Sequence, residues 1–129
     1  MTTVDPELAE ALATKLFAAI AANDLDALRD DVYTPDVVVW HNNDGHGQTI
    51  DENLRVLNFL HRTLPDRRYE EVRRQPTPTG FVEQHVLRAT AKDGRPIEVP
   101  ACLVVTVTGD RISRIDEYID SAHIAVISG

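Results

Sequence analysis

The chain contains one cysteine, few basic residues and no long apolar run. Cys102 has no partner for an internal disulfide, and no spacing of cysteine and histidine resembles a zinc site. Only 13 Lys and Arg stand against 21 Asp and Glu, so the sequence has no basic stripe of the kind that nucleic acids require. No apolar run approaches the roughly 20 residues of a membrane span, and the first residues lack the basic start of a signal peptide. We expect a cytoplasmic protein that binds neither nucleic acid nor membrane and uses no metal or cofactor.

The composition is that of an ordinary globular protein. Of 129 residues, 43% are hydrophobic and 26% are charged, and no linker or repeat divides the sequence. We therefore expect one domain over residues 1–129 that can bury one core.

Helical periodicity is confined to the first half of the chain. Leu12, Leu16 and Ile20 recur on one helical face after a capping Asp5 and a first-turn Pro6. The same reasoning, with Asp24 as a cap, gives the other segments of this half. We expect helices at 6–22, 25–32 and 51–64, with a strand at 36–42 and a loop at 43–47.

The second half alternates between apolar and polar residues and is divided by short turn sequences. It predicts strands at 69–75, 81–91, 97–108 and 111–121. Helices that precede a run of strands indicate an α+β fold, with an antiparallel sheet covered by helices on one face.

Strand alternation places ionisable residues on the covered face of this sheet. Glu83 and His85 share a face with Phe81, and Glu117 lies between Ile115 and Ile119. A buried imidazole or carboxylate costs several kcal/mol, roughly, unless it is paired or used, so these residues indicate a pocket.

The strand at 36–42 ends in a polar cluster that points to the same pocket. Val39 and His41 share one face of this strand, and Trp40 and Asn42 share the other. Alternation alone does not decide which pair faces inward.

Three segments together resemble the nuclear transport factor 2-like superfamily, which includes ketosteroid isomerases, limonene epoxide hydrolases and SnoaL-like polyketide cyclases. They are ANDLD at 22–26, PDVVVWHN at 35–42 and GDRI at 109–112, which leads to Glu117. The resemblance covers nearly the whole chain. It implies a cone-shaped α+β barrel with N-terminal helices packed on a curved, mostly antiparallel sheet, and many chemistries share this fold.

The resemblance argues against a standard ketosteroid isomerase. The aspartate base of that enzyme falls at or next to His41, its tyrosine donor falls at Phe17 and its protonated aspartic acid falls near Leu103. Neither Phe17 nor Leu103 can donate a hydrogen bond to an enolate oxygen.

The aspartate-arginine-aspartate relay of the epoxide hydrolases is also interrupted. Its positions fall at His85, Glu83 and Glu117, and a glutamate cannot replace an arginine that joins two carboxylates. We expect instead that His85 hydrogen-bonds Glu117, and that Glu83 near Glu117 raises the pKa of one carboxyl group. A structural ion pair between His85 and Glu117, or a His41 that only bonds a loop carbonyl, are the alternatives.

These observations predict a metal-free acid–base enzyme, of the isomerase, cyclase, dehydratase or hydrolase type, whose ligand is a hydrophobic small molecule. The alternative is a non-catalytic binding or scaffold protein of the same fold, and in either case we expect a homodimer formed through the sheet. The candidate catalytic residues are His41, His85, Glu117 and Glu83, with Glu117 or His41 as the base and His85 as the acid. The candidate substrate-binding residues are Phe17, Val39, Trp40, Asn42, Leu57, Leu60, Phe81 and Leu103; Trp40 is alternatively a packing residue of the core or the dimer.

Overall fold

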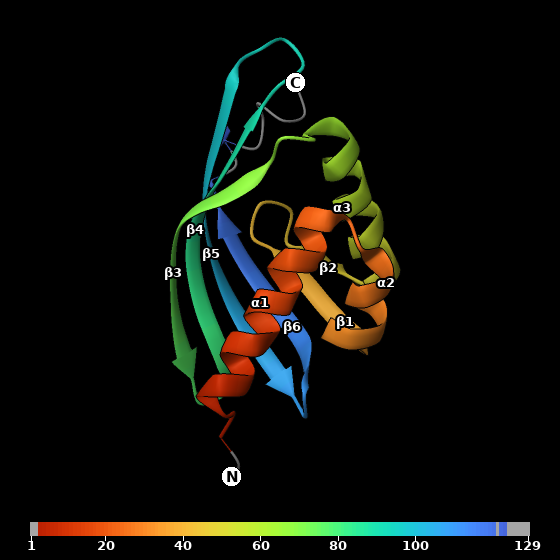
Figure 1. Ribbon diagram of the computed structural model, residues 1–129, viewed down its shortest axis with the longest axis vertical. Coiled ribbons are helices and arrows are strands. Elements are labelled where there is room, and N and C mark those ends of the chain that lie inside the picture. Colours follow the sequence, from red (N-terminus) through yellow and green to blue (C-terminus); the bar gives the residue numbers. More distant parts are fainter. Residues whose placement is uncertain (1–2, 121, 124–129) are drawn as a thin grey trace.

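The computed structural model describes residues 3–120 and 122–123 of the chain (Figure 1). The helical elements are α1 (Pro6–Ala22), α2 (Leu25–Ala27), the π-helical turn η1 (Leu28–Val32) and α3 (Ile50–Thr63). The strands are β1 (Tyr33–His41), β2 (Gly47–Gln48), β3 (Arg68–Thr77), β4 (Gly80–Thr90), β5 (Pro96–Thr108) and β6 (Arg111–Ile119). The expected end of the last strand, Ser121, lies outside the described residues.

The six strands form one curved, open sheet in the order β2-β1-β6-β5-β4-β3. Neighbouring strands are antiparallel except β1 and β6, which run parallel. Helices α1 and α3 lie on the concave side of the sheet (Figure 1). The α+β class and the helices on one face are as expected from the sequence.

Local capping explains where α1 begins and ends and where α3 begins. Asp5 accepts a hydrogen bond from the backbone N–H of Glu7 at 3.0 Å, and Asn23 ends α1 in the left-handed conformation with φ 53°. Thr49 and Glu52 form a reciprocal capping box at the start of α3. The box fixes the start of α3 directly after β2.

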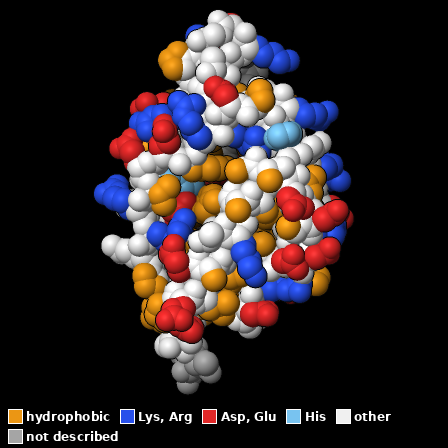
Figure 2. Space-filling model, in the orientation of Figure 1, with side chains coloured by type: hydrophobic (Ala, Val, Ile, Leu, Met, Phe, Trp, Pro, Cys, Tyr) orange, Lys and Arg blue, Asp and Glu red, His pale blue; other side chains and the backbone are white. Residues whose placement is uncertain are grey.

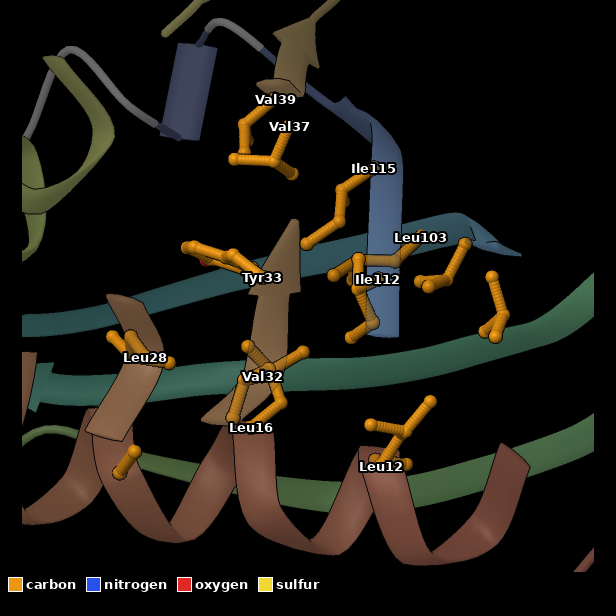
Figure 3. Close-up of a cluster of buried hydrophobic side chains, with 14 of the residues drawn as sticks. Leu12, Leu16, Leu28, Val32, Tyr33, Val37, Val39, Leu103, Ile112 and Ile115 are labelled. Atoms are coloured by element: carbon orange, nitrogen blue, oxygen red, sulfur yellow. The ribbon is translucent and has the colours of Figure 1, made fainter. Parts of the chain in front are cut away.

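The core lies between α1 and the concave face of the sheet. Leu12 and Leu16 point from α1 toward β5 and β6, where they meet Leu103, Ile112 and Ile115 (Figure 3). Burial of each such leucine contributes about 2 kcal/mol from the apolar surface removed from water. The stripe that predicts α1 is therefore the stripe that attaches it to the sheet.

Two local features differ from the sequence expectation. Residues 43–46 form the expected loop, but Gly47 is not part of it and forms a short strand with Gln48, which pairs with Val39. The expected helix at 25–32 changes to π-helical geometry, in which Tyr33 N–H donates to the carbonyl of Leu28. Within the described residues, no helix is both long and apolar enough to cross a membrane.

Candidate functional site

A cavity of about 270 Å³ lies between α1, α3 and the concave face of the sheet. Its apolar walls come from all three elements, as expected for a site that binds a hydrophobic molecule. Five of the predicted substrate-binding residues line it: Phe17, Val39, Leu57, Leu60 and Leu103. Val56 and Phe59 of α3 line it as well and remain 37% and 49% exposed, so they lie where the cavity opens toward solvent.

A second hollow lies beside this cavity, between α1 and β3 (Figure 2). Phe17 and Tyr69 line both spaces, and Arg74 and Glu83 line only the second. Apolar side chains are visible inside the hollow and charged side chains gather around it (Figure 2).

His41 and Glu117 form one ion pair in the wall of the main cavity. They are direct neighbours on the parallel strands β1 and β6, and His41 Nε2 lies 2.8 Å from Glu117 Oε1. Burial by itself lowers the pKa of His41, but the hydrogen bond and charge of Glu117 outweigh it, so the pKa is raised above its ordinary value. The pairing favours the protonated, positively charged form of the His41 ring.

His85 and Glu83 form a second and deeper pair on β4. Both side chains are almost completely buried, at 1% and 0% exposed, and His85 Nδ1 lies 2.5 Å from Glu83 Oε2. Arg74 donates to the other oxygen of Glu83 at 2.7 Å and to Glu10 of α1 at 2.6 Å. Glu83 therefore lies between a guanidinium and an imidazole, which compensates for the burial of its charge.

The ring of His85 is held by aromatic contacts as well as by Glu83. Its centroid lies 4.7 Å from that of Tyr69 and 5.4 Å from that of Phe17. The ring forms part of the cavity wall, and its Nε2 makes no hydrogen bond within the described residues. The atom free to meet a ligand is thus Nε2.

A sequence model of the SnoaL-like domain matches residues 13–115 of the chain. The chain belongs to this family. The match confirms the resemblance drawn from the sequence, and it covers every residue that lines the main cavity except Glu117 and Ile119 near the end of β6. No curated protein sequence is significantly similar to this SnoaL-like domain.

Solved structures share the fold of this SnoaL-like domain along nearly its whole length. IdmH of Streptomyces antibioticus, a proposed polyketide cyclase, is 21% identical, with a TM-score of 0.76 over 94% of this chain and 99% of that one. A proposed polyketide cyclase of Xanthomonas campestris is 16% identical, with a TM-score of 0.81 over 95% and 98%. An NTF2-like protein of Burkholderia xenovorans is 15% identical, with a TM-score of 0.78 over 97% and 98%. At these identities the likeness establishes the cone-shaped α+β fold.

The expected pairing of His85 with Glu117 is wrong. His85 bonds Glu83, its neighbour two positions before on the same strand, whereas Glu117 bonds His41. Leu103 of β5 pairs with both Glu83 and Glu117 and so lies between them. Glu83 and Glu117 therefore each have their own imidazole, and the expected close contact between these two carboxylates is not formed.

Three predicted substrate-binding residues lie outside the cavity wall. Val39 and His41 take the inward positions of β1, so Trp40 and Asn42 occupy its opposite face. There Trp40 packs edge-to-face on Tyr118, with their ring centroids 5.5 Å apart. Phe81 shares the inward face of β4, but the core of the SnoaL-like domain covers it to 1% exposure.

The sequence reasoning missed a polar chain on the far side of the cavity. Tyr33 O–H donates to Asn53 Oδ1 at 2.9 Å, and Asn53 Nδ2 donates to Gln48 Oε1 at 3.1 Å. One available signal was Asn53 itself, a polar residue beside Leu54 on the apolar face of a predicted helix.

In the part of the chain that the structure describes, no three His, Cys, Asp or Glu side chains converge as metal ligands do.

Proposed function

We propose that this protein is an acid–base enzyme of the cyclase type that closes a ring in an apolar dicarbonyl compound by intramolecular aldol addition. The observation that carries the proposal is that two histidines, each paired with its own carboxylate, face one apolar cavity. The descriptions of IdmH and of the Xanthomonas campestris protein as proposed polyketide cyclases support this choice among acid–base reactions.

Glu117 is the base in this proposal. His41 Nε2 occupies Oε1 of Glu117, and the second carboxylate oxygen makes no hydrogen bond within the described residues. His41 Nδ1 is buried and has no partner there, so neither ring nitrogen of His41 is placed to meet a ligand. His41 is accordingly a positioning residue that orients the Glu117 carboxylate.

His85 is the acid in this proposal. Arg74 donates to one oxygen of Glu83, and the other oxygen accepts the Nδ1 hydrogen of His85. The carboxylate stabilises positive charge on the ring whenever Nε2 carries a proton. Nε2 can therefore give a proton to a carbonyl oxygen in the cavity and take one back from solvent.

The reaction needs no reagent beyond the substrate. Glu117 removes a proton from a carbon next to one carbonyl, which leaves an enolate. The enolate carbon forms a bond to the second carbonyl carbon, whose oxygen receives the proton of His85 Nε2. The product is an isomer of the substrate, and proton exchange with water resets Glu117 and His85.

Hydrogen exchange at the α-carbon of a small apolar ketone tests the base directly. We expect the protein to accelerate exchange of the C1 hydrogens of 2-tetralone in D₂O at pD 7, measured by proton NMR. We expect Glu117→Gln to lose at least about 100-fold of this acceleration, the scale typical of a positioned general base. His85→Gln is the matched control, since exchange requires only the first step and this variant should retain most of it.

The same assay separates an enzyme from a carrier. Binding of 2-tetralone without acceleration of exchange contradicts the proposed function and supports a non-catalytic binding protein. Exchange that survives Glu117→Gln contradicts the assignment of the base.

We also propose that the protein forms a homodimer through the outer face of the sheet. Val104 and Tyr118 are 39% and 48% exposed, and they alternate with the inward residues Leu103 and Glu117. Trp40 packs on Tyr118 on the same outer face. Partly exposed aromatic and aliphatic side chains on one sheet face are typical of the centre of a protein interface.

A further inference from the structure

Gln48 has a side chain that faces the cavity with one half of its carboxamide occupied. We infer that Gln48 binds a carbonyl oxygen of the ligand through its Nε2 hydrogens and stabilises the negative charge that develops there. The inference rests on the proposed function and adds the group that holds the enolate oxygen. Gln48 supplies a hydrogen-bond donor, which the apolar side chains of Phe17 and Leu103 cannot provide.

The carboxamide of Gln48 is held by a chain of buried hydrogen bonds from three different elements. Tyr33 at the start of β1 donates to Asn53 of α3 at 2.9 Å, and Asn53 donates to Gln48 of β2 at 3.1 Å. All three side chains line the cavity, and they are exposed by only 1%, 4% and 9%. A buried and connected chain of this kind restricts the rotation of its last member.

The direction of the chain follows from Tyr33. Burial raises the pKa of its hydroxyl, which therefore keeps its hydrogen, and Asn53 is its sole hydrogen-bond partner within the described residues. If both amides were reversed, Asn53 would donate to Tyr33, and the O–H hydrogen would be buried without an acceptor. Leaving a buried donor unpaired is costly, whereas a spare lone pair on a hydroxyl is tolerated. The chain therefore runs from Tyr33 to Gln48.

This direction leaves donors, and not an acceptor, at the cavity. Oε1 of Gln48 receives the Asn53 hydrogen bond, while Nε2 makes no hydrogen bond within the described residues. Nε2 is not one of the fully buried polar atoms that lack a hydrogen-bond partner, so its surface is accessible to a ligand in the cavity. A carboxamide N–H₂ that is held in place before the ligand arrives is suited to a carbonyl or enolate oxygen.

The position of Gln48 in the sheet fits a substrate that extends across the cavity. Gln48 pairs with Val39 on β1, and Val39 pairs with Ile115 on β6, so Gln48 lies one inward row away from the His41–Glu117 pair. His85 lies on β4, beyond β6 in the other direction along the sheet. Glu117 therefore lies between Gln48 and His85. A ligand that presents its acidic C–H to Glu117 can place one carbonyl near Gln48 and the second near His85.

Binding of a ketone and its hydrocarbon counterpart tests this assignment without turnover. We expect wild-type protein to bind 2-tetralone about fivefold more tightly than tetralin, the scale of one neutral hydrogen bond. In ¹⁵N-labelled protein, the two Nε2 hydrogens of Gln48 should shift on addition of 2-tetralone and should not shift by a comparable amount on addition of tetralin.

Two variants separate the donor from the chain that positions it. Gln48→Met keeps the size of the side chain and removes the donors, and we expect it to abolish the preference for 2-tetralone while it still binds tetralin. Tyr33→Phe keeps the carboxamide but releases its direction, and we expect it to retain part of the preference. Thermal unfolding of both variants verifies that they are folded.

The outcomes distinguish this inference from the proposed function. Equal binding of the two ligands by wild-type protein, or an undiminished preference in Gln48→Met, overturns the role of Gln48 and leaves the assignment of Glu117 intact. Failure of both ligands to bind the wild-type protein overturns both, because the cavity is then not a site for apolar ketones.

Discussion

Tyr69 and Arg74 lie five positions apart on β3, yet both direct their side chains to the concave side of the sheet. Tyr69 lines the main cavity and Arg74 bonds Glu83. Five positions would put two residues on opposite faces of a regular strand. The register of β3 shifts between Glu70 and Arg73, where Glu71 adopts a positive φ of 55°, and this bulge brings Arg74 to the inner face.

Arg74 should contribute strongly to stability because it neutralises a fully buried carboxylate. We expect Arg74→Met to lower the free energy of unfolding by about 3 kcal/mol, since it leaves Glu83 buried beside only His85. Urea denaturation followed by circular dichroism measures the loss. Arg68→Met is the matched control on the same strand, because Arg68 is 53% exposed and should change stability by no more than about 0.5 kcal/mol.

A double-mutant cycle separates the ion pair from other contacts of Arg74. We expect Arg74→Met with Glu83→Gln to be less destabilising than the sum of the two single changes by at least about 1 kcal/mol. Strictly additive losses contradict a direct interaction between Arg74 and Glu83.

The pairing of His41 with Glu117 predicts a reversal in the pH dependence of stability. The raised pKa of folded His41 gives a stabilising contribution that is fully present below pH 6.5, the ordinary value, and is lost as the pH rises through the folded pKa. In Glu117→Gln the burial of the ring dominates, so the pKa should fall below 6.5 and stability should rise with pH across this range.

Proton NMR titration of the His41 ring and unfolding curves between pH 5 and pH 8, ranges chosen around the pKa of free histidine, measure the two effects. A His41 midpoint that does not move in Glu117→Gln contradicts the account of this pair.

The capping box connects β2 to α3 and should be measurable as a local contribution to stability. We expect Thr49→Ala to lower the free energy of unfolding by about 1 kcal/mol, because it removes the side-chain acceptor of Glu52 N–H. Thr14→Ala is the matched control, since Thr14 is an exposed residue inside α1. A larger effect of Thr14→Ala than of Thr49→Ala contradicts the capping role.

The proposed dimer requires the outer face of the sheet and not the surface of α3. Val104 and Val56 are similarly exposed, at 39% and 37%, but lie on β5 and α3. We expect Val104→Glu to convert the protein to a monomer and Val56→Glu to leave the dimer unchanged, as measured by light scattering after gel filtration. A wild-type protein that is monomeric at all concentrations removes the proposal.

The sequence predicted the parts of the site that depend on strand alternation. It placed Glu83, His85 and Glu117 on the inner face, because each shares that face with apolar neighbours in an uninterrupted run. It left the face of β1 open, and the structure decides it in favour of His41. Helix α1 was predicted with its observed bounds because its apolar stripe and both caps are local signals.

The partners of these residues depended on register, which alternation does not contain. His85 could be paired with Glu117 only by assuming that they were close, and the parallel pairing of β1 with β6 gives Glu117 to His41 instead. The inward position of Arg74 could not be predicted, because the bulge at Glu71 that turns it to the inner face cannot be read from the sequence. Gln48 directly follows the loop expected at 43–47. The strand that it forms with Gly47 could not be predicted, because two residues are too few to show an alternating pattern.

The most direct test of the account is the ¹H–¹⁵N spectrum of the histidine rings, recorded with and without heptane-2,6-dione, a ketone that carries a second carbonyl for His85. The claim is that His85, held by Glu83 at Nδ1, presents Nε2 to a ligand in the cavity that Glu117 also lines. We expect Nε2 of His85 to shift on addition of the ketone, while the exposed ring of His46, which bonds Glu52, stays unchanged. An unchanged His85 ring in protein that has bound the ketone contradicts the account.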